Sequence, residues 1–159
     1  MITKSTVVQR MQDLKLYGCQ NHFLDHFEEM LSKNQSTLEI LNALLVAEQD
    51  TVSNKKVLAL LNKSKIRYPT SNLIDIDCSN KDGLTNDILQ TFADCEWIKS
   101  KQNLIFTGAT GIGKTWLASA FGTNACKFGY KVLFYNSTEL FEDFETALRL
   151  GTITILRKK

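Results

Sequence analysis

The sequence lacks the features of membrane, disulfide-bonded and disordered proteins. No apolar run approaches the roughly 20 residues of a membrane-spanning helix, and the first residues have no signal-peptide core. The four cysteines are scattered singly without a C-x-x-C pair, which disfavours both a zinc site and a disulfide framework. With one proline, 43% hydrophobic residues and no low-complexity tract, the composition is typical of a folded protein, which we expect in the cytoplasm.

An excess of charge of one sign is also missing from the chain as a whole. The 19 Lys and Arg residues nearly balance the 17 Asp and Glu residues, so the net charge of +2 gives little support for a polyanionic partner. One local cluster of basic residues has no acid within it: Lys55, Lys56, Lys63, Lys65 and Arg67. This cluster could neutralise DNA phosphates, or it could be the solvated face of a helix.

Residues 1–67 show the apolar spacing of helices throughout. The spacing predicts a first helix that Gly18 ends, a second helix after it, and a third that begins at the capping box of Ser36. A fourth helix is predicted to begin at Ser53 or Asn54. The sequence therefore predicts an all-α N-terminal region.

Residues 68–72 contain the only proline and predict a connector to a second region, 73–159. After an amphipathic helix from about Thr85 to Lys99, two continuous apolar runs, 104–107 and 132–135, alternate with helical segments. Such runs are typical of strands covered on both faces, and a strand, helix, strand order predicts a parallel crossover. The expected fold class is therefore α/β, with a parallel-sheet core that follows the helical region.

A phosphate-binding motif lies between the first apolar run and the helix after it. The octet matches G-x-x-x-x-G-K-[ST] at every fixed position. A loop that follows a strand and opens a helix can surround a phosphate with backbone amides at the positive end of the helix. We predict that all eight residues bind a nucleotide: Gly108, Ala109, Thr110, Gly111, Ile112, Gly113, Lys114 and Thr115.

Two side chains of the octet have predicted roles of their own. Lys114 is expected to reach the β and γ phosphates, and the Thr115 hydroxyl is expected to coordinate Mg²⁺. No N-K-x-D element of the GTPase kind follows the loop, which favours ATP over GTP. An incidental glycine-containing turn explains the octet less well, because the flanking segments also fit the motif.

Hydrolysis of ATP needs an acidic residue at the end of a further buried strand, where it holds magnesium. The apolar run 132–135 ends in Asn136 and Ser137, and neither residue is acidic. Asn136, with Glu139, is predicted to cap a final helix instead. The sequence therefore predicts a nucleotide-binding half without a hydrolytic half, and it indicates no catalytic residue.

Several segments together resemble the IstB-like ATP-binding proteins, which are transposition helpers of bacterial insertion sequences related to the helicase loader DnaC. The likeness spans nearly the whole chain and is carried by the loop and five short stretches: Arg67–Pro69, Ile74–Asp77, Cys95–Ile98, Asn103–Gly108 and Ala125–Tyr130. The resemblance implies an AAA+ P-loop ATPase that forms homo-oligomers on DNA and regulates the transposase of its element. In that case residues 73–159 are the N-terminal part of the ATP-binding domain.

The resemblance also marks what differs from the family pattern. Family members continue through a Walker B strand, a sensor residue and an arginine finger, and Thr152–Leu156 is more strand-like than the helix expected there. We therefore expect a truncated copy or a fragment. A non-enzymatic remnant that at most binds nucleotide is one alternative function. A phosphotransferase with the same loop is another, although no lid arginines are found for it.

Overall fold

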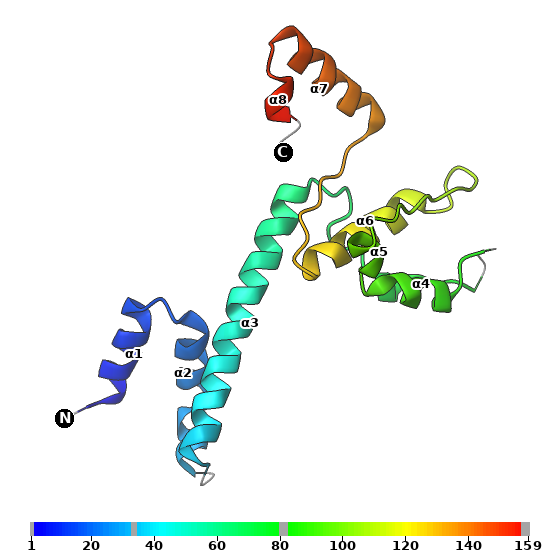
Figure 1. Ribbon diagram of the computed structural model, residues 1–159. Helices are drawn as coiled ribbons and strands as arrows, with labels where there is room; N and C mark the ends of the chain where they lie inside the picture. The colour runs from blue at the N-terminus through cyan, green and yellow to red at the C-terminus, as the bar shows by residue number, and fades with distance from the viewer. Residues whose placement is uncertain (1, 33–34, 80–82, 157–159) are drawn as a thin grey trace. The chain divides into compact units, whose positions relative to one another are not determined.

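The computed structural model describes residues 2–32, 35–79 and 83–156, and most of them lie in helices (Figure 1). The chain divides into two compact units, Met1–Ala59 and Leu60–Lys159. No helix in the described ranges is long and apolar enough to cross a membrane. The division of the sequence at residues 68–72 stays a prediction.

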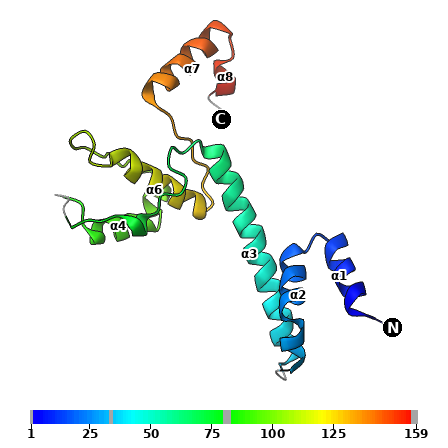
Figure 2. The same cartoon turned by 180° about the vertical axis from the view of Figure 1, so that it is seen from behind.

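The first unit contains α1 (Lys4–Asp13), α2 (Tyr17–Ser32) and most of α3 (Thr37–Ser64). The predicted capping box is confirmed, because the Ser36 amide donates to Glu39 Oε2 at 2.8 Å and the Glu39 amide donates to Ser36 Oγ at 3.2 Å. In both Figure 1 and Figure 2, α2 runs beside the N-terminal part of α3.

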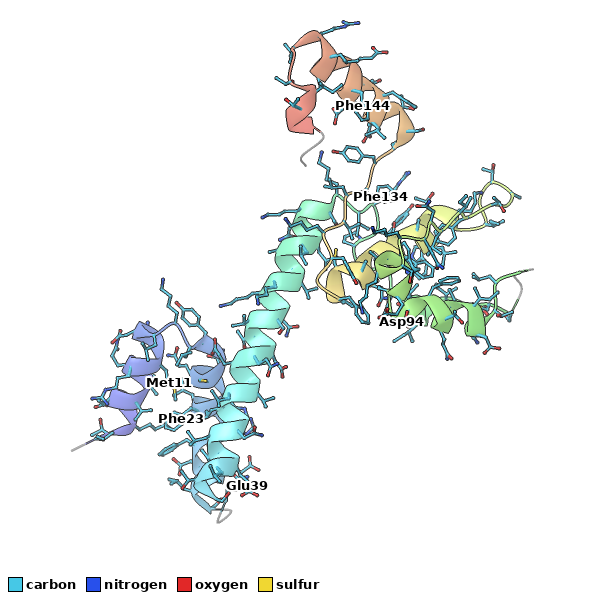
Figure 3. All side chains as sticks on the ribbon, in the orientation of Figure 1. Met11, Phe23, Glu39, Asp94, Phe134 and Phe144 are labelled. Atoms are coloured by element: carbon cyan, nitrogen blue, oxygen red, sulfur yellow. The ribbon has the colours of Figure 1, made fainter. Side chains whose placement is uncertain are left out.

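The core of this unit is a small apolar cluster that all three helices share. Cys19, Met30 and Leu44 are buried at its centre, and Met11 and Phe23 pack against them. Figure 3 shows Met11 on α1 and Phe23 on α2 in the space between these two helices. Burial of these side chains stabilises the packing of the three helices on one another.

The sequence predicted that Gly18 ends the first helix. This prediction is wrong, because Gly18 lies in the first turn of α2. A Cβ atom at Gly18 would lie 2.3 Å from the carbonyl oxygen of Ala47, so only glycine permits this approach of α2 to α3. Glu48 completes the contact, since its Oε2 accepts hydrogen bonds from the amides of Gly18 and Cys19 at 2.7 and 3.1 Å. The carboxylate thus caps the start of α2 from the neighbouring helix.

The predicted third and fourth helices form one continuous helix, α3. Ser53 and Asn54 lie inside it and do not cap a new helix. Their helix propensities are roughly a few tenths of a kcal/mol below those of good helix formers, so the surrounding Leu, Ala and Lys residues carry the helix through them.

The second unit contains the 3₁₀ turn η1 (Leu73–Asp75) and the helices α4 (Asn86–Ala93), α5 (Glu96–Lys99), α6 (Lys114–Lys127), α7 (Ser137–Arg149) and α8 (Ile153–Leu156). Its core joins Ile76, Leu89 of α4 and Phe121 of α6. The predicted cap of α7 is confirmed, because Asn136 Oδ1 accepts from the Thr138 amide at 3.1 Å. The prediction of a strand-like Thr152–Leu156 is wrong, since most of that stretch is α8.

The predicted parallel-sheet core is wrong. None of the described residues lies in a strand, and 104–107 and 132–135 are extended without a ladder between them. In the first run, Leu104 and Phe106 are partly buried against the core, whereas Ile105 between them is 84% exposed. The run 104–107 therefore has one covered face, whereas a strand inside a parallel sheet is covered on both. Two strands without further partners would in any case form at best a marginally stable pair. Along 132–135, the Phe134 amide donates instead to the carbonyl of Ser64 at 2.8 Å.

The amphipathic helix predicted from Thr85 to Lys99 is broken into α4 and α5. The break lies at Cys95, which has a left-handed backbone with φ of 60° and is fully buried. The side-chain amide of Asn124 in α6 fixes this turn by donating to the carbonyl of Ala93 at 2.6 Å. Burial raises the pKa of the Cys95 thiol.

We predict that Gly18→Ala destabilises the first unit by about 2 kcal/mol, because the added methyl group overlaps the Ala47 carbonyl and must push α2 away from α3. Urea unfolding followed by circular dichroism measures this change. Asn21→Ala, at an exposed position of the same helix, is the matched control and should change the unfolding free energy by less than about 0.5 kcal/mol. Equal stability of the two variants would contradict this close approach of the helices.

Candidate functional site

The loop 108–113 joins the extended run 104–107 to the first residue of α6. Gly111 and Gly113 have φ angles of 87° and 92°, a backbone conformation that favours glycine. A Cβ atom at either position would meet nothing within 4 Å, so the glycines serve the curvature of the loop and not close packing. The result is an exposed turn that leads directly into a 14-residue helix.

Lys114 begins α6, and its ammonium group folds back over the loop. Its Nζ donates hydrogen bonds to the carbonyl oxygens of Gly108 at 2.9 Å and Ala109 at 2.6 Å. Within the described ranges no carboxylate forms an ion pair with Lys114. The positive charge therefore lies at the loop, held by carbonyl dipoles and not neutralised by an acid.

The start of α6 presents backbone amides without acceptors. The first hydrogen bond of the helix runs from the Leu117 amide to the carbonyl of Gly113 at 2.9 Å. No described residue accepts a hydrogen bond from the amides of 113–116, and Gly113 provides no side-chain cap. Free N–H groups at the positive end of a helix, beside one ammonium group, are donors of the kind that bind a phosphate.

An aromatic pair fixes both ends of this loop. Phe106, two residues before Gly108, stacks on Phe121 of α6 with ring centroids 5.6 Å apart and an angle of 22° between the planes. Phe121 is itself buried in the core of the unit. The entry to the loop and the helix after it are thus tied to one another.

The loop closes one end of a cavity of about 740 Å³. Gly108, Gly113 and Lys114 line the cavity on the loop side, and Ile88 and Phe92 of α4 line it on the other. Among the described residues that line the cavity there is no carboxylate, and Lys114 is the one that carries a charge. The cavity has the size of an ordinary small-molecule site, roughly 300 to 1,000 Å³.

Two other sequence predictions concern Thr115 as a magnesium ligand and five basic residues as a DNA-binding cluster. Thr115 is exposed beside Lys114, as the motif requires, and no group of three or more His, Cys, Asp or Glu side chains in the described residues could hold a metal ion. Lys55 and Lys56 belong to the first compact unit, whereas Lys63, Lys65 and Arg67 belong to the second.

Three of the five basic residues lie beside tyrosine rings. Lys55 Nζ is 4.5 Å from the ring centroid of Tyr17, and Lys65 Nζ is 5.8 Å from that of Tyr135. The guanidinium carbon of Arg67 lies 5.8 Å from the ring centroid of Tyr68. Such cation–π contacts orient the charged groups without neutralising them.

The family model for the IstB-like ATP binding proteins matches residues 9–158, nearly the whole chain. The chain belongs to this family. It is 32% identical over 147 residues to the ATP-binding protein of insertion sequence IS1162 from Pseudomonas fluorescens, covering 92% of this chain and 63% of that protein. It is also 32% identical over 153 residues to the insertion sequence ATP-binding protein y4uH of Sinorhizobium fredii, covering 94% and 60%.

An insertion sequence IS21-like ATP-binding protein of Bacteroides fragilis is 27% identical over 144 residues, which cover 90% of this chain and 71% of that relative. The family assignment therefore rests on nearly the whole chain and not on the loop alone. This IstB-like chain spans about three fifths of the length of the first two relatives, 63% and 60%.

Residues outside the motif contribute to the site of this family member, and no sequence pattern indicated a functional role for them. Ile88 and Phe92 belong to the predicted apolar stripe of a helix, a pattern that packing alone explains. Their place in the cavity wall depends on how α4 packs on α6, which no local pattern specifies. Phe106 belongs to a predicted strand, whose pattern gave no sign of its contact with Phe121.

Proposed function

We propose that this chain binds ATP with magnesium through the loop 108–115, as a helper protein of DNA transposition. The free amides at the start of α6, next to the Lys114 ammonium group, support this proposal most directly. Lys114 would exchange its bonds to two loop carbonyls for charge-assisted bonds to phosphate oxygens, which are stronger. The Thr115 hydroxyl would hold the magnesium ion.

Membership of a family of ATP-binding proteins supports the same ligand, and the names of the relatives connect them with insertion sequences. The remaining parts of the proposal follow from the family: a cytoplasmic protein that assembles with other copies and acts with the transposase of the same element. The chain spans 63% and 60% of the length of two relatives, so we propose these interactions for family members of that full length.

We predict that Lys114→Ala lowers the affinity for ATP and magnesium by about tenfold to a hundredfold, because a hydrogen bond to a charged group contributes about 1.5 to 3 kcal/mol. Isothermal titration calorimetry measures the affinity. Lys131→Ala, which removes an exposed ammonium group of the same unit outside the loop, is the matched control and should bind like the wild type.

Thermal unfolding of both variants separates loss of the site from loss of the fold. The hydrogen bonds of the Lys114 ammonium group go to loop carbonyls, so its removal should leave the melting temperature nearly unchanged. Equal ATP affinity of Lys114→Ala and wild type would refute the proposed site.

We further propose that the chain binds ATP without turning it over. The described lining of the cavity has no carboxylate that could hold the ion or orient an attacking water. Asn136, at the end of the run 132–135, caps α7 and so serves the fold. A phosphate-release assay should give the same low rate for wild type and Lys114→Ala, and a wild-type rate well above the variant would overturn this part.

DNA is the proposed macromolecular partner. The basic residues proposed to contact it are Lys55 and Lys56 in the first compact unit, and Lys63, Lys65 and Arg67 in the second. The tyrosine contacts of Lys55, Lys65 and Arg67 support it, since they hold cations in place without neutralising them. We predict that changing Lys55, Lys56, Lys63 and Lys65 to Gln weakens DNA binding. The negative slope of log affinity against log salt should become shallower by about one unit for each phosphate that a lysine no longer neutralises.

Fluorescence anisotropy with a labelled duplex at several salt concentrations gives both quantities. The control variant carries Gln at four lysines outside the cluster: Lys4, Lys99, Lys127 and Lys131. Unchanged affinity and slope in the cluster variant would show that these lysines form a solvated surface.

A further inference from the structure

The two histidines of the chain form a pair on one helix. His22 and His26 lie four residues apart in α2, and their ring centroids are 4.6 Å apart with an angle of 42° between the planes. Residues at this spacing lie on the same face of a helix, one turn from each other. His22 is partly buried and the side chain of His26 is 47% exposed, so the pair is open to ions from the solvent.

A carboxylate orients one ring of the pair. Glu29 Oε2 lies 3.2 Å from Nδ1 of His26, nearly one turn further along α2. A neutral imidazole that donates a hydrogen bond from Nδ1 keeps its lone pair on Nε2, the nitrogen that is then available to a metal ion. Carboxylate, histidine and metal in this order are the common arrangement of a histidine ligand, because the carboxylate fixes the tautomer and makes the ring a stronger ligand.

The helix that carries the pair is held in place by the core of the first unit. Phe23, next to His22, packs against the buried cluster, and its ring centroid is 4.9 Å from that of Phe27. Glu48 accepts hydrogen bonds from the first amides of α2. The backbone between the two histidines is therefore ordered before an ion binds, which lowers the entropy lost on binding.

The geometry and the donor atoms suit a transition-metal ion. A Zn–N bond is about 2.0 to 2.1 Å long, so two nitrogens on one zinc ion are at most about 4.2 Å apart. Rings with centroids 4.6 Å apart can bring one nitrogen each within that limit. Imidazole nitrogen suits Zn²⁺, Ni²⁺ and Cu²⁺, whereas Mg²⁺ prefers oxygen ligands.

We propose that His22 and His26 together bind a transition-metal ion such as Zn²⁺, with Glu29 as a positioning residue for His26. No group of three or more His, Cys, Asp or Glu side chains in the described ranges could hold an ion, so water completes the coordination at this two-histidine site. The site belongs to the first compact unit and the loop 108–115 to the second, and zinc binding by α2 goes beyond the proposed function.

Calorimetric titration of the full chain with zinc chloride, without nucleotide or magnesium, tests the site. Wild type should bind zinc, and His22→Gln and His26→Gln should each lower the affinity by about tenfold to a hundredfold, at least the loss that follows removal of a partner behind a ligand. Glu29→Ala should lower it by about tenfold. Glu28→Ala is the matched control, since it removes the adjacent exposed carboxylate, and it should bind zinc like the wild type.

Thermal unfolding followed by circular dichroism gives a second measurement. An ion that binds the folded chain raises the unfolding midpoint, so zinc should raise it in wild type and Glu28→Ala and leave it unchanged in His22→Gln. Without zinc the three proteins should have the same spectrum, which separates loss of the site from loss of the fold.

Equal zinc affinity of wild type and His22→Gln would overturn the site and assign the ion to other ligands, such as the free cysteines. A wild type that takes up no zinc would overturn it as well. Zinc affinity of Glu29→Ala equal to that of Glu28→Ala would refute the positioning role of Glu29. The titration contains no nucleotide, so each of these results leaves the proposed ATP site as it stands.

Discussion

The stacking of Phe106 on Phe121 is the contact on which the geometry of the loop depends. It joins the residues just before the loop to the middle of α6, the helix that the loop begins. On the buried face of α6, Phe121 lies among small side chains such as Ser119, Ala120 and Ala125. With its entry and exit held in this way, the loop is left with few conformations, and glycines at 111 and 113 permit the one it takes.

The electrostatics of the loop follow from that geometry. α6 starts without a side-chain cap, and the amides of its first turn have no acceptor among the described residues. Free donors at a helix start are costly when buried and harmless when exposed. Here they lie in an exposed turn next to the Lys114 ammonium group, which has no acid partner in the part of the chain that the structure describes. The first unit satisfies the same requirement differently, because Glu48 accepts from the first amides of α2. One helix start is closed by a carboxylate of the chain, and the other is open to an anion from outside.

Local patterns predicted the parts of this molecule that local interactions decide. The capping box at Ser36, the Asn136 cap and the start of α6 at the loop all involve residues within four positions of each other. The predictions that were wrong depend on distant contacts. Gly18 lies within α2 because Ala47 passes close to it, and the runs 104–107 and 132–135 form no sheet because strand pairing needs partners that apolar periodicity does not specify. For the same reason the octet could be recognised from the sequence, whereas the place of Ile88 and Phe92 in the cavity lining could not.

Family membership, the open helix start and the cavity beside the loop together support the proposal that the chain binds ATP in a transposition system. On this view the amides of 113–116 are the phosphate ligands. Amide hydrogen exchange, resolved by residue with and without magnesium and ATP, tests their role most directly. We expect that exchange slows strongly at 113–116 and stays unchanged at the amides of α1 and α2. Equal exchange at 113–116 in both samples, under conditions where ATP is bound, would contradict it.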